Sequence, residues 1–425
     1  MSATATAALD PREIGNILMS PLAFTEARIH DLFAAMRAHG APLWVTPDNT
    51  RPFWAVTRHA QIVEASSRND VFISSRRSTM LNRAQEAAAF RGAEKYGRVL
   101  RSLIHMDMPD HKRYRAVAQP WFNAAAVRGW QPLLDELTAE FFEKFTAENG
   151  RGRIDFAAEV ATLFPLRVIM AILGVPAADL PLMHRLTKTL AAPQDADFGA
   201  TAQSGDTLFD SIPLFTDYFL DFIAERRRHP RDDLASTIAN GMVEGEPMGE
   251  LETVSYFITM IVAGHDTTAA AMAGGCHALA ERPADWARLR ADPGLLRTAP
   301  DEMIRWVTPI RHFMRTAAAD HTLGGQLIRK DESITLFYLA GNRDEDVFEA
   351  ADQFRLDRAP NRQVAFGFGP HVCMGMVLSR LELATWFGAM ARRIETLAPD
   401  GEVRMITTNF LGGYKSAPIR YTFAA

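Results

Sequence analysis

The spacing of apolar and polar residues predicts a chain that is mainly helical. Apolar residues recur at helical spacing in the segments 133–145, 160–173, 212–223 and 254–279. A glycine followed shortly by a proline ends a helix, so the second of these segments should stop at the Gly174-Val175-Pro176 sequence. From about Asp107 onward, helix dominates the pattern.

Strands are expected in three places. Segment 42–56 carries Trp44, Phe53 and Trp54 between turn-forming residues, which is typical of a hairpin at the edge of a small sheet. Beta character returns at 322–339 and in the glycine-punctuated tail, 404–423. Neither an internal repeat nor a linker interrupts the pattern. We therefore expect one domain over residues 1–425, mainly α with small β-sheets.

Composition narrows the class of protein. A net charge of −5 gives no electrostatic reason to expect nucleic acid as a partner. With only two cysteines, Cys276 and Cys373, a disulfide framework is excluded. The N-terminus lacks a signal-peptide pattern, and no apolar run reaches the roughly 20 residues that a membrane span needs. We expect a soluble, cytoplasmic monomer without membrane contact.

The most informative stretch is the loop Phe366-Gly367-Phe368-Gly369-Pro370-His371-Val372-Cys373-Met374-Gly375, which precedes a helix-compatible run. Its glycines let the backbone approach a flat ligand closely and point N–H groups at the sulfur. A zinc site is excluded because no second ligand stands at the required spacing from Cys373. The alternative is a buried free cysteine in a glycine-rich turn. Cys276 is interpreted as a small core residue of its helix.

This loop resembles the haem loop of the cytochrome P-450 family, Phe-Gly-x-Gly-x-His-x-Cys-x-Gly, at every fixed position. The resemblance implies heme b (iron protoporphyrin IX) as cofactor and Cys373 as the metal ligand, donating electron density to the iron. It also implies that His371 contacts a haem propionate, that Phe366 shields the sulfur, and that Gly367 and Gly375 lie against the haem.

Further basic residues resemble the family's propionate contacts. His111 and Arg115 match a helix whose His and Arg bind these groups, and Arg315 matches a third contact. Arginine suits carboxylates because its planar fork donates two hydrogen bonds. Each of these residues taken alone would be interpreted as a solvated surface charge.

A second motif resembles the family's Glu-x-x-Arg helix. Glu302 and Arg305 are three positions apart, which places them on one helical face. The segment that would close on this pair contains Asn342, Arg343, Asp344, Phe348, Phe354 and Arg358. The resemblance assigns the pair to folding and haem retention, whereas the tetrapeptide alone would favour an exposed ion pair.

Within the apolar helix 254–279 lies Ala263-Gly264-His265-Asp266-Thr267-Thr268. Polar groups are costly to bury without a role, although Gly and Thr can also mark a local kink. By resemblance, Asp266 is the acid and Thr267 the alcohol that deliver protons to bound O₂. For His265 we expect packing or a hydrogen bond between helices.

The resemblance implies a monooxygenase that inserts one oxygen atom of O₂ into a small hydrophobic substrate. The segments AGHDTT, TPIRHFMRTA and TNFLGGYKSAPIRY look most like soluble bacterial enzymes that oxidise monoterpenoids such as terpineol, or alkylbenzenes. Steroid and fatty-acid hydroxylases have similar segments and remain alternatives. By family position, substrate contacts fall in 75–100, 190–215, 261–267, 310–314 and 410–414. For Arg311, beside these contacts, the outward orientation is the commoner one.

Electrons are expected from a separate iron-sulfur ferredoxin and its ferredoxin reductase, because the chain has no room for a fused reductase. Lys112, Arg113 and Arg362 are candidates for a basic docking patch with salt-sensitive binding. Two other classes remain open. A haem-thiolate peroxygenase or isomerase would need no electron partner, and a haem sensor would bind gases without forming product.

Overall fold

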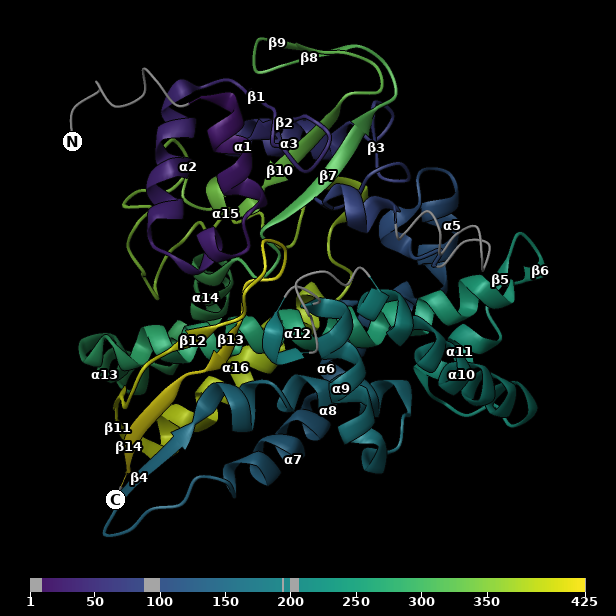
Figure 1. Ribbon diagram of the computed structural model, residues 1–425. Coiled ribbons are helices and arrows are strands. Elements are labelled where there is room, and N and C mark those ends of the chain that lie inside the picture. The colour runs from purple at the N-terminus through teal and green to yellow at the C-terminus, as the bar shows by residue number, and fades with distance from the viewer. Residues whose placement is uncertain (1–9, 88–99, 193–194, 199–205, 425) are drawn as a thin grey trace.

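The computed structural model describes residues 10–87, 100–192, 195–198 and 206–424. As expected, it is mainly helical with small sheets (Figure 1). The helices are α1 (Pro11–Met19), α2 (Arg28–His39), α3 (His59–Ser67), α5 (Asp110–Ala118), α6 (Ala124–Gly129), α7 (Gln131–Phe142), α8 (Phe164–Leu173), α9 (Leu180–Ala191), α10 (Asp206–Arg228), α11 (Leu234–Ala239), α12 (Glu250–Ala280), α13 (Pro283–Ala291), α14 (Ala299–Val307), α15 (Tyr338–Gly341) and α16 (Met376–Arg393).

The largest sheet has five strands in the order β1-β2-β10-β7-β3. The predicted hairpin at its edge is confirmed, because β1 and β2 pair antiparallel with Trp44 opposite Trp54. The strands are β1 (Leu43–Val45), β2 (Phe53–Val56), β3 (Phe72–Ile73), β4 (Arg151–Asp155), β5 (Met242–Val243), β6 (Glu246–Pro247), β7 (His312–Ala317), β8 (His321–Leu323), β9 (Gln326–Ile328), β10 (Ser333–Phe337), β11 (Ile394–Pro399), β12 (Arg404–Met405), β13 (Tyr414–Ser416) and β14 (Pro418–Phe423).

The predicted helix 160–173 is divided in two. A π-helical turn, Ala157–Ala161, comes first, and α8 then begins at Phe164 with Pro165 in its first turn, where a proline is well tolerated. The predicted stop is confirmed. Gly174 follows the last helical residue with φ of +71°, a left-handed conformation that favours glycine.

Helices α1, α2 and α3 were missed by the sequence interpretation. The buried residues of α2 are Ile29, Leu32, Phe33 and Met36, which have the i, i+3, i+4, i+7 spacing of an amphipathic helix. The pattern was present, but charged residues between these positions make the segment polar on average. This face packs into a small cluster of apolar residues beside the five-stranded sheet.

The principal core lies among the helices. One large apolar cluster joins residues of α7, α8, α12, α14 and α16, and two smaller clusters lie around the sheet. Helix α12 crosses the middle of the molecule and contacts α8, α9, α14 and α16 (Figure 1). Among the residues described above, no helix combines the length and apolar character that crossing a membrane requires.

Candidate functional site

The loop before α16 is a tight turn closed by backbone hydrogen bonds. The Cys373 N–H donates to the Phe366 carbonyl at 2.8 Å, and the Gly367 N–H donates to Val364 at 2.9 Å. Gly367 and Gly369 have φ of +71° and +70°, which a residue with a Cβ adopts only with strain. The glycines that the sequence singled out therefore allow this turn to present the sulfur.

Cys373 is exposed as a residue, although protein atoms enclose much of its surroundings. Burial raises the pKa of the thiol, whereas the Gly375 N–H and the guanidinium groups of Arg115 and Arg380 lower it. The net shift of the thiol pKa is upward, so a metal ion that binds this sulfur would displace its proton. A Cβ built at Gly375 would meet no protein atom within 4 Å, so there is room beside the loop.

Four basic side chains converge near this sulfur from α5, β7 and the loop. The rings of His111 and His371 lie 4.0 Å apart. Burial, followed by the charges of His111, Arg315 and Arg115, lowers the pKa of His371 to about 2. The pKa of His111 is lowered to about 4, first by burial and then by Arg115 and Arg315. The structure thus brings together all four predicted propionate contacts with Cys373.

This cluster has the electrostatics of a site for an anionic group. In the described part of the chain, no carboxylate is among the charged groups that perturb His371, and Asp107, which raises the pKa of His111, acts on it less than Arg115 and Arg315 do. Arg315 is 6% exposed and donates one hydrogen bond, to the Met314 carbonyl at 2.7 Å. A buried guanidinium normally has an anionic partner. A haem, which combines an iron for the sulfur with two propionates for the cations, fits these residues.

The acid of helix α12 has a partner that the sequence interpretation missed. The Lys188 ammonium on α9 donates to Asp266 Oδ1 at 2.6 Å, and both side chains are buried. Burial raises the pKa of Asp266, but His265 and Lys188 lower it more, so the net shift is downward. The carboxylate is therefore ionised. Its Oδ2 is buried and accepts no hydrogen bond from the described residues.

Thr267 lies one residue further along α12 and is partly exposed. Its hydroxyl donates to the Ala263 carbonyl one turn earlier, at 2.9 Å. Thr268 instead faces α16, where its hydroxyl donates to Ser379 Oγ at 3.2 Å. Helix α16 begins directly after the cysteine loop. The hydrogen bond between Thr268 and Ser379 therefore connects α12, one residue after Thr267, to the helix that follows Cys373.

His265 bonds between helices, as expected. Its Nδ1 lies 2.9 Å from Thr187 Oγ1 on α9, and its Nε2 lies 2.6 Å from the Thr162 carbonyl before α8. Gly264 lies at another close contact, because a Cβ there would come within 2.8 Å of Ile169 on α8. The residues around Asp266 thus fasten α12 to its neighbours.

Glu302 and Arg305 form a fully enclosed ion pair, since both side chains are 0% exposed. Arg305 donates to both carboxylate oxygens, at 2.7 and 2.8 Å. Glu302 also accepts from the Arg355 N–H at 2.7 Å and from the Arg358 guanidinium at 3.0 Å. The segment expected to close on the pair therefore does so, and the exposed alternative is wrong.

Arg311 points inward, contrary to the orientation favoured from the sequence. Its guanidinium donates to the Thr408 carbonyl and lies 5.2 Å from the centre of the Phe24 ring. Gly412 makes room, because a Cβ there would be 2.9 Å from Arg311 Nε. Burial lowers the pKa of Arg311 to about 10. A backbone acceptor and an aromatic face, neither visible in the sequence pattern, make burial possible.

Two other expectations concern individual segments. Cys276 is buried in α12, as expected for a core residue, and burial raises the pKa of its thiol. Of the expected substrate-contact segments, 88–99, 193–194 and 199–205 lie outside the described residues. The other segments include Ile310, whose backbone pairs with Leu411 in an isolated bridge.

Comparison with known proteins identifies relatives over nearly the full chain. The Cytochrome P450 family profile matches residues 294–423. Cytochrome P450-terp from Pseudomonas sp is 32% identical over 97% of this chain and 98% of its own length. Linalool 8-monooxygenase from Pseudomonas putida is 28% identical, covering 94% and 97%. The crystal structure of CYP108D1 from Novosphingobium aromaticivorans superposes with a TM-score of 0.89 at 36% identity, covering 97% and 99%.

Proposed function

Because this chain belongs to the cytochrome P450 family, we propose that this haem-thiolate monooxygenase inserts one oxygen atom of O₂ into a small neutral hydrophobe, a monoterpenoid or an alkylbenzene. The observation that carries the substrate class is the position of Arg311. Its guanidinium already donates to the Thr408 carbonyl through Nη1 and lies over the Phe24 ring, so a substrate carboxylate would have to compete with these contacts. The neighbouring Ile310 and Phe313 are apolar. The name of the linalool-oxidising relative agrees with this class.

In this proposal Cys373 ligates the iron of heme b, and the basic cluster holds the propionates. Arg115 and Arg315 would supply charge-assisted hydrogen bonds, while His111 and His371 would each donate one from a ring nitrogen. The Phe366 ring, which lies 5.0 Å from the Arg380 guanidinium carbon, would shield the sulfur. When bound, the haem supplies the iron that activates O₂ and transfers oxygen to the substrate.

Asp266 and Thr267 would move protons toward the O₂ site. The Asp266 carboxylate is held by Lys188, and its second oxygen, 3.5 Å from His265 Nδ1, accepts no hydrogen bond from the described residues, so this oxygen is where a proton would be received. Thr267 is the hydroxyl next to it on the partly exposed side of α12. An ionisable group followed by a rotatable hydroxyl is a chemically sufficient route for a proton.

Thr267→Ala should still bind haem, substrate and CO, because no ligand is removed, and should still consume O₂. Without an ordered hydroxyl, protons should arrive incorrectly, so that hydrogen peroxide is released and organic product per NADH falls several-fold. Asp266→Asn should instead slow the whole cycle by about 10²-fold, since the ionisable member is lost. Product, NADH and peroxide are measured together in a reconstituted system.

Thr268→Ala is the matched control, because this threonine is adjacent in sequence but bonds to Ser379 on α16. It should retain normal coupling. Each variant is normalised to its CO-binding haem content, which excludes loss of folded protein as the cause. Unchanged coupling and rate in both Thr267→Ala and Asp266→Asn would contradict the proton route and favour a peroxygenase or a sensor.

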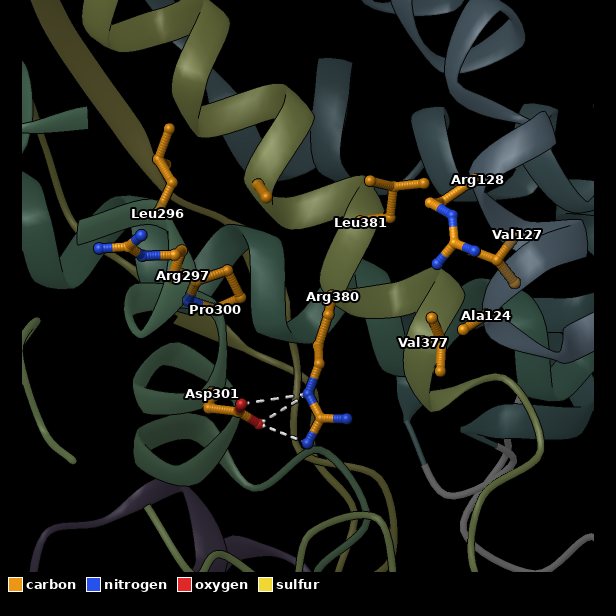
Figure 2. Close-up of a pocket in the computed structure, with 11 residues that line it drawn as sticks. Ala124, Val127, Arg128, Leu296, Arg297, Pro300, Asp301, Val377, Arg380 and Leu381 are labelled. Carbon is orange, nitrogen blue, oxygen red and sulfur yellow. Dashed lines mark hydrogen bonds and ion pairs between the residues drawn. The ribbon is translucent and has the colours of Figure 1, made fainter. Parts of the chain in front are cut away.

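We propose that an acidic iron-sulfur ferredoxin, reduced by its ferredoxin reductase, supplies the electrons at a groove lined by the first turns of α16, the helix that follows the cysteine loop (Figure 2). The groove has a volume of about 240 Å³ and lies between α6, α14 and the first turns of α16. Its floor is apolar, with Val127, Pro300 and Leu381 among the lining residues. Exposed Arg128 and Arg297 stand at its edge.

Charge complementarity favours an acidic partner there. The groove's acidic lining residue, Asp301, is already paired with Arg380 at 2.9 Å, as the dashed lines in Figure 2 show. Of the residues proposed from the sequence, Lys112 and Arg362 are exposed. Arg113 is partly neutralised by ion pairs with Asp110 and Glu244. A carboxylate-rich surface would therefore meet exposed cations that have no ion pair among the described residues.

The substrate proposal is tested by titrating the haem-loaded protein with a panel of compounds. Terpineol, linalool and an alkylbenzene should displace iron-bound water and shift the Soret band from its low-spin to its high-spin position at micromolar concentration. A fatty acid should not, because Arg311 is committed to the protein interior. If only steroids or fatty acids produce the shift, the substrate class is wrong while the monooxygenase assignment stands.

A further inference from the structure

A pocket away from the cysteine loop is lined mainly by basic side chains. It has a volume of about 350 Å³, and four of its lining residues are cations: Arg51, Arg76, Arg77 and Lys330. It lies where the strands β7 and β10 meet the segment before residue 87. The proposed oxygenase reaction makes no use of this pocket.

Two buried polar atoms that line the pocket make no hydrogen bond to any described residue. Arg77 is 6% exposed and donates through Nη2 to Thr50 Oγ1 at 2.8 Å. Its Nε makes no hydrogen bond to any described residue but forms an ion pair with Glu86 Oε1 at 3.5 Å. The Thr316 hydroxyl, on a residue 4% exposed, is likewise buried without a hydrogen-bond partner among the described residues. A buried donor that makes no hydrogen bond lowers the stability of the protein unless a ligand accepts a hydrogen bond from it.

The charges around the pocket are not balanced. Arg51 pairs with Glu86 at 3.0 Å, and Arg76 pairs with Asp331, all at the rim. Lys330 is exposed and has no ion pair within the described ranges. Burial lowers the pKa of Arg77 to about 10, which leaves it a cation at neutral pH. Because Arg51 and Arg77 share Glu86, four cations face two carboxylates, Glu86 and Asp331, which leaves a net excess of two positive charges.

The pocket is distinct from the basic cluster beside Cys373. Thr316 and Arg315 are consecutive in β7, and consecutive side chains of a strand point to opposite faces of the sheet. Arg315 perturbs His111 and His371, whereas Arg77 perturbs neither of them and acts on His312. The two groups of cations thus occupy opposite sides of one strand.

We propose that this pocket binds the tetrahedral oxyanion of a phosphate or sulfate ester, between the floor formed by Arg77 and Thr316 and the rim at Lys330. Donors that approach from several directions suit a tetrahedral group, whereas a planar carboxylate is best matched by a single guanidinium fork. The pocket has about ten times the volume of one water molecule, which leaves space for a small organic remainder.

The test is calorimetric titration of the haem-loaded protein with phenyl phosphate, phenyl sulfate and benzoate. We expect one of the two esters to bind with one-to-one stoichiometry, and benzoate at least tenfold more weakly. Thr316→Val, which removes the hydroxyl at nearly constant volume, should weaken ester binding about tenfold. Lys330→Ala should weaken it several-fold. Arg329→Ala removes a neighbouring exposed cation outside the pocket and should leave the affinity unchanged.

The Soret spectrum, recorded in the same titrations, separates this site from the haem pocket. Ester binding should leave the spectrum unchanged. The proposal is wrong if neither ester binds, if benzoate binds equally well, or if Arg329→Ala weakens binding as much as Lys330→Ala. It is also wrong if the Soret band shifts on ester binding and Thr316→Val has no effect, because the compound then occupies the haem pocket. None of these outcomes depends on the identity of the oxygenase substrate.

Discussion

Replacing Cys373 with histidine should abolish the long-wavelength Soret band of the reduced, CO-bound protein. That band arises because an anionic sulfur donates strongly to the iron–CO unit, and a neutral imidazole cannot reproduce this donation. Cys373 is exposed and lies in a turn that Phe366, Gly367 and Gly369 shape around it. Monooxygenase activity should be lost together with the band.

Cys276→Ala is the matched control, because Cys276 is the other of the two cysteines and is buried in α12. It should retain the band in full. Difference spectra of both variants, normalised to the haem extracted from each, distinguish a changed ligand from lost haem. Survival of the band in Cys373→His would mean that another residue ligates the iron.

Glu302→Ala should yield little folded, haem-loaded protein. Arg305 and Arg358 both direct their guanidinium groups at this buried carboxylate, and the Arg355 N–H donates to it as well. Removing it leaves two buried cations without their anion, which costs about 3–5 kcal/mol. That is a large part of the stability of an ordinary domain. The haem-to-protein ratio and the melting temperature measure the effect.

Glu349→Ala is the appropriate comparison, since Glu349 pairs with Arg355 at the surface and is 89% exposed. Its melting temperature should match that of the parent protein. Glu302→Gln, which keeps the shape and part of the hydrogen bonding, should fall between the two. A normal melting temperature and haem content in Glu302→Ala would show that the pair is dispensable for folding.

The residues best predicted from the sequence are those held by short motifs. The turn around Cys373 depends on glycines within a few positions, and Glu302 reaches Arg305 over one helical turn. Local geometry connects such residues, so the order of residue types is enough to predict them. The stop at Gly174 and the edge hairpin at Trp44 and Trp54 were predictable for the same reason.

Long-range partners were not predictable in this way. Lys188 reaches Asp266 from another helix, and nothing in its local sequence distinguishes it from a surface lysine. The inward orientation of Arg311 depends on the Thr408 carbonyl and on space at Gly412, both distant in sequence. Tertiary packing, rather than local preference, determines these contacts. Arg77 Nε and the Thr316 hydroxyl, which make no hydrogen bond to any described residue, likewise cannot be recognised before the strands are assembled.

The basic cluster beside Cys373 also bears on how this protein is made. His111 and Arg115 are synthesised well before Cys373, so the complete site can form only when most of the chain has been made. The bound haem contacts parts of the chain that are distant in sequence. Because a ligand that binds only the folded state stabilises that state, haem binding should stabilise the fold. Supply of haem in the cell should accordingly govern how much of this polypeptide survives proteolysis.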